Sequence, residues 1–439
     1  MLRRTVMAVS ALGLLTAGAN LLTACDKTKP VTDAPTSATD ARPSIERNAT
    51  TTPTPMPSDI PRALAVGSNA LAFDLWGQLA KGGRSNAAFS PASISIAFAM
   101  TYGGAKGETA EQIEKVLHFE GEPAALGASW GALGRELSDP SRPIKLRIAN
   151  RLYGEKTYAF VPEFLERTKT SFGAPLELVD FKTAPEPARQ TINAWVEQQT
   201  EKRIKGLLPP QSLEPLTRMV LVNAIYFLGD WAKPFEPSRT SDEPFHTSAS
   251  ATKRVPTMKQ TDYFGVGRTA GVNVLELPYK GNTASLLLVV PENVDGLAAV
   301  EATLSSSTLE TWKRAATPQN VSVWLPRFEV NPAESLPLSK HLTALGMPIA
   351  FDRDKADFTG IGNPKDEREK LHIAEAFHKA FVKVDEKGTE AAAATAVVTA
   401  EGAGMPAKPI ELKIDRPFLF FVLDKPTGLV LFMGRVTEP

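Results

Sequence analysis

Cysteine is almost absent from this sequence of 439 residues, because Cys25 is the only one. A single thiol excludes an intramolecular disulfide. Since Cys25 lies in the N-terminal segment, a thiolate metal cluster or a cysteine nucleophile in the folded part is excluded as well. The five histidines show no spacing typical of a metal motif. We therefore expect no metal and no cofactor.

Net charge is also lacking, since Lys plus Arg and Asp plus Glu number 49 each. No window holds the cluster of about five to eight basic residues that indicates a polyanion site. Binding to a phosphate backbone depends on such cationic groups, so we expect no nucleic-acid partner. A hydrophobic content of 43% with ordinary charge density instead indicates a large globular core.

One catalytic motif is matched by residue type but not by its surrounding sequence. The segment Gly127–Gly131 matches the Gly-x-Ser-x-Gly nucleophile elbow around Ser129. An elbow places its serine directly after a β-branched strand, whereas residues 122–134 are rich in Ala, Leu and Gly and have a helical pattern. We predict a surface helix here and a protein that is not an enzyme.

The first 24 residues have the order of an export signal. Arg3 and Arg4 precede an apolar run, Val6–Leu22, that is broken by Gly, Ser and Asn. A transmembrane anchor is the alternative, but the run falls short of the roughly 20 strongly apolar residues of a membrane span. It ends in Leu-Thr-Ala-Cys at 22–25, which resembles the lipobox of bacterial lipoproteins.

The lipobox resemblance implies that residues 1–24 are a lipoprotein signal peptide and that Cys25 carries the lipid. It also implies an exported protein, anchored to a bacterial membrane and facing the periplasm or the cell exterior; inner and outer membrane both stay open. Residues 25–59 are mostly Thr, Pro, Ser, Ala and Asp, so they cannot build a core and are predicted to be a linker. As a coil this linker spans roughly 30 to 35 Å.

No comparable break follows, so we expect one α+β domain over residues 60–439. Apolar residues at helical spacing predict helices at Leu64–Leu79 and Ala188–Gln199. Short runs of β-branched, aliphatic and aromatic residues predict buried strands at Thr217–Phe227, Ala284–Val290, Val321–Leu325, Ala380–Val384, Pro417–Leu423 and Gly428–Gly434.

The segment after Val384 is unusual in its small side chains. Read with a period of two, one face carries only small or apolar residues, at Thr389, Ala391, Ala393, Thr395 and Val397. Such a face can enter a closely packed sheet without a clash. Because alanine favours helices over strands, a short exposed helix or an alanine-rich loop remains an alternative from local sequence.

The run Val384–Ala393 resembles the reactive-loop hinge of the serpin family. Further serpin-like segments occur in the family's order at Asn86–Ile94, Asn223–Phe235, Pro326–Phe328, Asp415–Phe418 and Leu431–Val436. The resemblance therefore covers nearly all of residues 60–439. It implies the serpin fold, with three β-sheets, eight or nine surrounding helices and an exposed reactive-centre loop near the C terminus.

The family's activity implies irreversible, suicide-substrate inhibition of a serine or a cysteine endopeptidase. The protease cleaves the loop, forms an acyl-enzyme and is carried away as the loop inserts into the main sheet. We expect a monomer whose partner is the target protease. Small hinge residues favour this activity over a non-inhibitory binding or chaperone-like role; the hinge comprises Glu386, Gly388, Thr389, Glu390, Ala391, Ala392, Ala393, Ala394 and Thr395.

The family resemblance also implies roles for two further sets of residues. Ser90, Ser93, Asn223 and His378 correspond to the shutter beneath the main sheet, and Trp231 corresponds to the breach where insertion starts. Counting from the hinge and from Asp415 places the cleaved bond in a window at 401–406. The scissile-bond candidates are Glu401, Gly402, Ala403, Gly404 and Met405. Without Lys or Arg in this window, an elastase-like or subtilisin-like target is favoured over a trypsin-like one, while Glu401 would suit a glutamate-specific enzyme.

Overall fold

The computed structural model describes residues 59–364, 369–389 and 408–439. The predicted signal peptide, Cys25 and nearly all of the linker lie outside the described residues, as do the hinge from Glu390 to Thr395 and the scissile-bond candidates. Asp59, which we assigned to the linker, begins the first helix. No helix in the described ranges has the length and apolar character needed to cross a membrane.

Nine α-helices occur in the described part of the chain. They are α1 Asp59–Leu79, α2 Pro91–Tyr102, α3 Gly107–Leu117, α4 Pro123–Leu137, α5 Pro162–Phe172, α6 Pro185–Gln199, α7 Leu297–Glu301, α8 Ser306–Ala315 and α9 Leu338–Leu345. Proline opens α2, α4, α5 and α6, where its missing N–H would be unsatisfied in any case. The helices predicted from periodicity are confirmed as parts of α1 and α6.

The strands include all six that were predicted. They are β1 Ala87–Phe89, β2 Lys145–Glu155, β3 Glu177–Val179, β4 Met219–Asp230, β5 Ser241–Ser248, β6 Ala251–Thr269, β7 Val272–Pro278, β8 Ala284–Pro291, β9 Thr317–Pro326, β10 Phe328–Val330, β11 Leu336–Pro337, β12 Ala376–Val384, β13 Gly388–Thr389, β14 Ile410–Lys413, β15 Phe418–Asp424 and β16 Val430–Val436. Continuous apolar runs produced β4, β8, β15 and β16, which are buried along most or all of their length.

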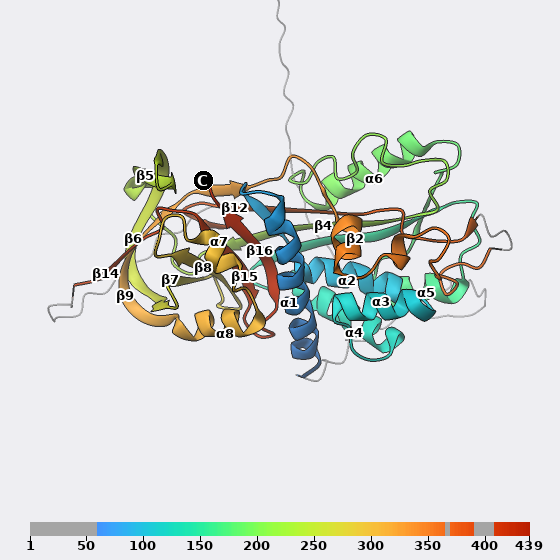
Figure 1. The fold of residues 1–439 in the computed structure, drawn as a ribbon, viewed down its shortest axis with the longest axis horizontal. Coiled ribbons are helices and arrows are strands. Elements are labelled where there is room, and N and C mark those ends of the chain that lie inside the picture. Colours follow the sequence, from blue (N-terminus) through green and yellow to red (C-terminus); the bar gives the residue numbers. More distant parts are fainter. Residues whose placement is uncertain (1–58, 365–368, 390–407) are drawn as a thin grey trace, which may run out of the picture. The chain divides into compact units, whose positions relative to one another are not determined.

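One sheet carries the candidate site. Its strands follow the order β10-β12-β13-β4-β2-β3, with β11 beside β12. Alternate side chains of β4 enter two separate cores: Ile225 and Phe227 join the larger one, while Val222 and Tyr226 pack with Ile192 of α6 in the smaller. Figure 1 shows α6 and α2 on opposite sides of this sheet. Both faces are therefore covered.

The other sheet has the order β1-β16-β15-β8-β7-β6-β9-β14, with β5 beside β6. Strand β6 is 19 residues long. Its first part, 251–257, pairs with β5, its later part, 257–266, pairs with β9, and its end pairs with β7. Two of the three expected sheets are therefore joined by hydrogen bonds through β6, and the described strands form two networks.

Candidate functional site

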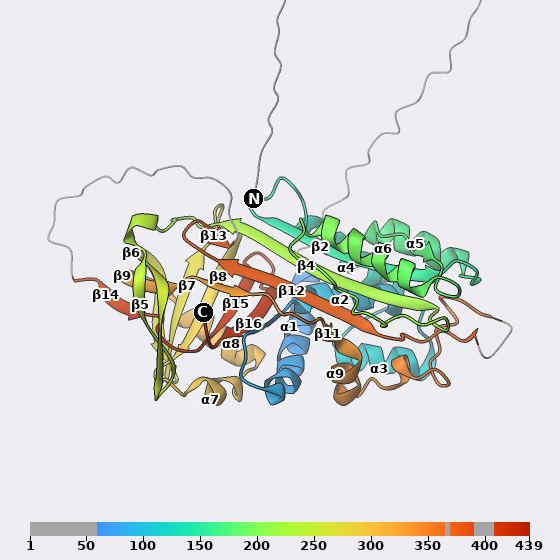
Figure 2. The same cartoon turned by 90° about the horizontal axis from the view of Figure 1, so that it is seen from above.

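The first hinge residues already occupy a strand position in the main sheet. After β12 the chain turns at 385–387 and returns as β13, where Thr389 pairs with Val384 of β12 and with Gly229 of β4. Figure 2 shows β13 beside the ends of β12 and β4. Thr389 is completely buried there. The sheet is thus open to a new strand at this end.

Beyond β13 the sheet is closed. Strands β12 and β4 pair directly and in parallel over six residue pairs, from Ala376 with Leu221 to Phe381 with Tyr226. Any longer inserted strand has to separate these pairs. The boundary between the open and the closed part lies between Phe381 and Val384 on β12.

Close contacts hold β13 in place. A Cβ atom on Gly388 would lie 2.0 Å from the carbonyl oxygen of Gly229, so only glycine fits at this position. The hydroxyls of Thr389 and Tyr279 lie 2.5 Å apart in the buried interior. Tyr279 in turn stacks on Trp231, with ring centroids 4.7 Å apart and planes 10° from parallel.

Trp231 contacts the turn that precedes β13. Its indole N–H donates to the carbonyl of Asp385 at 2.9 Å, and its backbone N–H donates to the carbonyl of Lys387 at 2.8 Å. The structure therefore places Trp231 at the point where the sheet begins to open. The role of Tyr279 was missed, because nothing local in its sequence distinguishes it from an ordinary core tyrosine.

Glu386 anchors the same turn from the other side. Its buried carboxylate accepts hydrogen bonds from Arg327 Nε at 2.8 Å and Nη2 at 2.5 Å, and from the Thr240 hydroxyl at 2.5 Å. Burial acts to raise the pKa of Glu386, but the hydrogen bonds from Arg327 and Thr240 outweigh it, and the pKa is lowered. The carboxylate stays ionised at neutral pH and ties the hinge to the start of β10.

The four residues predicted to form the shutter come together beneath the sheet. Asn223 of β4 donates to the Ser93 carbonyl at 2.7 Å and to the Ser93 hydroxyl at 2.8 Å. His378 of β12 accepts from the Ser90 N–H through Nε2 at 3.0 Å, and its Nδ1 contacts the Asn223 side-chain oxygen. Ser90 also caps α2 by accepting from the Ser93 N–H. This cluster links β12, β4 and α2.

Hydrogen-bond partners fix the state of His378. Because the Ser90 N–H can only donate, Nε2 must accept, and Nδ1–H then donates to Asn223. Complete burial lowers the pKa of His378 to about 3. A neutral imidazole therefore joins β12 to β4 through Asn223.

Asn150 of β2 is a fifth member that the sequence reasoning missed. Its amide donates to the Ser93 carbonyl at 2.9 Å, and its side-chain oxygen accepts from Asn223 at 2.8 Å. A signal was available, since Asn150 interrupts the apolar face of Leu146 and Leu152 at a spacing of two. The main sheet thus has polar groups on three neighbouring strands at one level.

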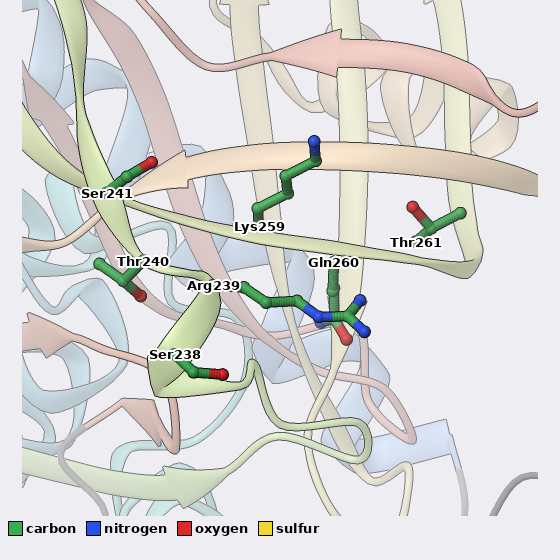
Figure 3. Close-up of a pocket in the computed structure, with 7 residues that line it drawn as sticks. All are labelled: Ser238, Arg239, Thr240, Ser241, Lys259, Gln260 and Thr261. Carbon is green, nitrogen blue, oxygen red and sulfur yellow. The ribbon is translucent and has the colours of Figure 1, made fainter.

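A polar hollow lies beside the Glu386 anchor. It measures about 450 Å³ and is lined by Ser238, Arg239, Thr240, Ser241, Lys259, Gln260 and Thr261. Figure 3 shows Arg239 extending toward Gln260, while Lys259 and Thr261 project from the same side of β6. Thr240 belongs both to the hollow and to the contacts of Glu386.

The enzymatic motif considered above does not form an elbow. Ser129 lies in α4, and its hydroxyl donates to the carbonyl of Ala125 one turn earlier at 2.9 Å. The prediction of a helix at this segment is confirmed. Within residues 59–364, 369–389 and 408–439, no three His, Cys, Asp or Glu side chains are grouped so that they could hold a metal ion.

Comparison with known proteins gives one consistent result. The family model described as Serpin (serine protease inhibitor) matches residues 66–439. Leukocyte elastase inhibitor A of Rattus norvegicus is 41% identical over 362 residues, which are 81% of this chain and 93% of the relative. Leukocyte elastase inhibitor of Homo sapiens is 38% identical over 388 residues, covering 86% of this chain and 99% of the relative.

The fold agrees with solved structures as well. The structure of uncleaved ovalbumin matches with a TM-score of 0.77 and 31% sequence identity, covering 86% of this chain and the whole of that one. The expected arrangement of mixed sheets surrounded by helices is thereby confirmed. The names of the relatives refer to inhibitors of a protease.

Proposed function

The chain belongs to the serpin family, and we propose that it is an irreversible, suicide-substrate inhibitor of a serine endopeptidase. The observation that carries this proposal is β13, since Gly388 and Thr389 already lie between β12 and β4. A cleaved loop can extend this short strand without finding a new register. The inhibitor is consumed in the reaction.

The register of β13 determines which residues of β12 and β4 would flank each residue of a longer inserted strand. With Thr389 opposite Val384 and Gly229, each later residue meets the next earlier residue of β12 and of β4. Thr395 would then lie between His378 and Asn223. Its small side chain would take the place of their direct hydrogen bond, on the same buried face as Thr389.

Extension of β13 would replace the hydrogen-bond ladder between β12 and β4 by two new ladders. The six parallel pairs between β12 and β4 would separate, and the new strand would form an antiparallel ladder with each of them. More backbone hydrogen bonds result, and antiparallel pairing is slightly the more stable arrangement per residue. This gain drives the movement.

The movement stops the protease. An acyl-enzyme linked about 16 residues from the start of the inserted strand would travel roughly 50 Å at 3.3 Å per residue. Since a displacement near 1 Å can slow catalysis about 100-fold, a protease dragged against the body of the inhibitor fails to hydrolyse its acyl bond. A stable covalent complex remains.

An elastase-like or subtilisin-like serine protease is the proposed target. Pairing along the whole of β4 down to Met219 would use the loop as far as Thr399, so the cleaved bond should follow that residue. The candidates Glu401, Gly402, Ala403, Gly404 and Met405 satisfy this condition. Their mostly small side chains fit small pockets, and the relatives' names as elastase inhibitors agree.

The direct test mixes the full chain with an elastase and separates the products by denaturing electrophoresis. We expect a band at the combined mass that survives detergent, together with a new N terminus within 402–406. A chain that is only clipped, with no complex, would identify a non-inhibitory member. A chain that stays intact would contradict the assigned target class.

Thr389→Arg should convert the inhibitor into a substrate. The arginine would bring a charge into a completely buried position beside Tyr279, where it has no partner, so insertion should fail while cleavage proceeds. We expect complex yield to fall at least tenfold. Thr389→Ser keeps the hydroxyl and the small volume and should retain the complex, so equal yields from the two variants would refute this account.

We also propose that the mature protein begins at Cys25, which carries a lipid and holds the protein on a bacterial membrane, facing the periplasm or the cell exterior. Support comes from the sequence Leu-Thr-Ala-Cys at 22–25 and from the linker that follows. The rat and human relatives give it no support. In a bacterial host, Cys25→Ala should release the protein from the detergent phase, and mass spectrometry of the mature N terminus should show acyl chains on the unchanged protein.

A further inference from the structure

We propose that the outward face of β6, β9 and β14 is a second contact surface for the target protease and fits an acidic patch beside that protease's cleft. The inference rests on the proposed inhibitory function. We call this surface the ladder face; it includes Lys259, Thr261, Ser322, Trp324, Lys413 and Glu411, with Tyr263 beyond Thr261.

Two lysines flank one indole on the ladder face. Trp324 of β9 lies opposite Lys259 of β6 and opposite Lys413 of β14. The Lys259 ammonium lies 4.5 Å from the centroid of the indole ring, and the Lys413 ammonium lies 5.4 Å from it. Each ammonium makes a cation–π contact with the same ring, which brings the two charges next to each other.

Within the part of the chain that the structure describes, these two charges have no anionic partner. Among the described residues, neither lysine forms an ion pair with a carboxylate, because Glu411, which lies on the same face opposite Ser322, pairs with Lys408, and nearby Asp262 pairs with Lys233. An exposed cation contributes little to stability, but two neighbouring cations attract an approaching anionic surface. An acidic patch on a protein partner has the complementary chemistry.

Apolar and polar contacts continue the surface. The Thr261 and Ser322 hydroxyls lie 2.7 Å apart on the next rung of the ladder, and Tyr263 beyond them is 66% exposed. Lys259 and Thr261 also line the 450 Å³ hollow, which Figure 3 shows beside β6. An exposed tyrosine, an indole and a hollow beside them are the usual parts of a protein contact surface.

The position of β14 indicates which partner would cover the ladder face. Ile410, the first residue of β14, is 45% exposed and follows the proposed cleaved bond closely in sequence. From Met405 to Ile410 the chain can span at most roughly 17 Å. A protease domain of about 240 residues has a radius of gyration near 18 Å, so an enzyme that holds this bond has to cover the surface around β14. The ladder face is part of that surface.

The experiment measures the association rate constant with two elastases of opposite net charge at several salt concentrations. The test variant is Lys259→Ala/Lys413→Ala in the full chain. Lys106→Ala/Lys115→Ala removes two exposed lysines from the region of α3 and serves as the matched control. Lys259→Arg/Lys413→Arg keeps both charges and the stacking on Trp324.

With the acidic elastase at low salt, we expect the alanine ladder variant to associate about fivefold more slowly, and the difference to vanish at high salt. The control and arginine variants should match the unchanged protein. The basic elastase should show no slowing. Because the reactive loop is untouched, the yield of covalent complex per molecule cleaved should be the same in all four proteins.

Equal rates for the ladder variant and the unchanged protein at every salt concentration would overturn the proposal. So would equal slowing of the control variant, which would indicate only a general charge effect. Loss of binding to anionic lipid vesicles by the ladder variant, with unchanged rates, would assign the face to a membrane instead. If no protein in the set forms a covalent complex, the proposed inhibitory function itself fails, which is a separate result.

Discussion

A neutral His378 is required by its two partners. Protonation would place a second N–H on Nε2, facing the Ser90 N–H, with no acceptor available. The pKa of about 3 lies below the ordinary value near 6.5, so the unfolded chain binds more protons between these values. The stability that neutral His378 provides is therefore lost progressively as the pH falls from about 6.5 toward 3.

At pH 5 this single group should lower the free energy of unfolding by about 2 kcal/mol relative to neutral pH. His378→Gln does not titrate and should lack this contribution. Urea unfolding at pH 7 and pH 5 would compare the two proteins. An NMR titration gives a second check, because the His378 ring signals should show no protonation between pH 8 and pH 5. A midpoint near 6.5 would contradict the lowered pKa of His378.

Strand β13 is a short element with few bonds of its own, so its occupancy depends on side-chain contacts. Tyr279→Phe removes the hydroxyl that meets Thr389 and leaves the ring stacked on Trp231. One buried hydrogen bond contributes about 1 kcal/mol, so hydrogen exchange of the Gly388 and Thr389 amides should accelerate roughly fivefold.

Tyr158→Phe is the matched control for this measurement. The Tyr158 hydroxyl is buried and has no hydrogen-bond partner among the described residues, so its removal should leave the exchange of β13 unchanged. Unchanged exchange in Tyr279→Phe as well would show that backbone pairing alone holds β13. Faster exchange in both variants would indicate general loosening of the core.

Elements with a continuous apolar run were predictable from sequence, because burial on both faces leaves a clear pattern, as in β8 and β16. The pairing of the short strand β13 was not predictable in this way, since it depends on β12 and β4 being held apart at one end. Arg327 and Tyr279 were missed for a related reason. Their partners, Glu386 and Thr389, are 59 and 110 residues away in the sequence.

Family resemblance supplied what periodicity could not. Ser90 and Ser93 are close in sequence, but Asn223 and His378 come from two other places, and only the fold brings the four residues into one hydrogen-bonded group. The cleaved bond and the lipid on Cys25 remain predictions, because they lie outside the described residues.

For the whole molecule, β12 and β4 pair directly beyond β13, so under the proposed mechanism the sheet can still gain a strand between them. Cleavage of the loop between 401 and 406 should let the chain complete two antiparallel ladders and place Thr395 between His378 and Asn223. We therefore expect the thermal midpoint to rise by more than about 10 °C, equivalent to several kcal/mol. Calorimetry before and after limited proteolysis would measure it. We expect Thr389→Arg to be cleaved at the same bond without inserting, so its midpoint should stay within a few degrees of its uncleaved value. A large rise in that variant would show that cleavage stabilises the protein by some route other than extension of β13.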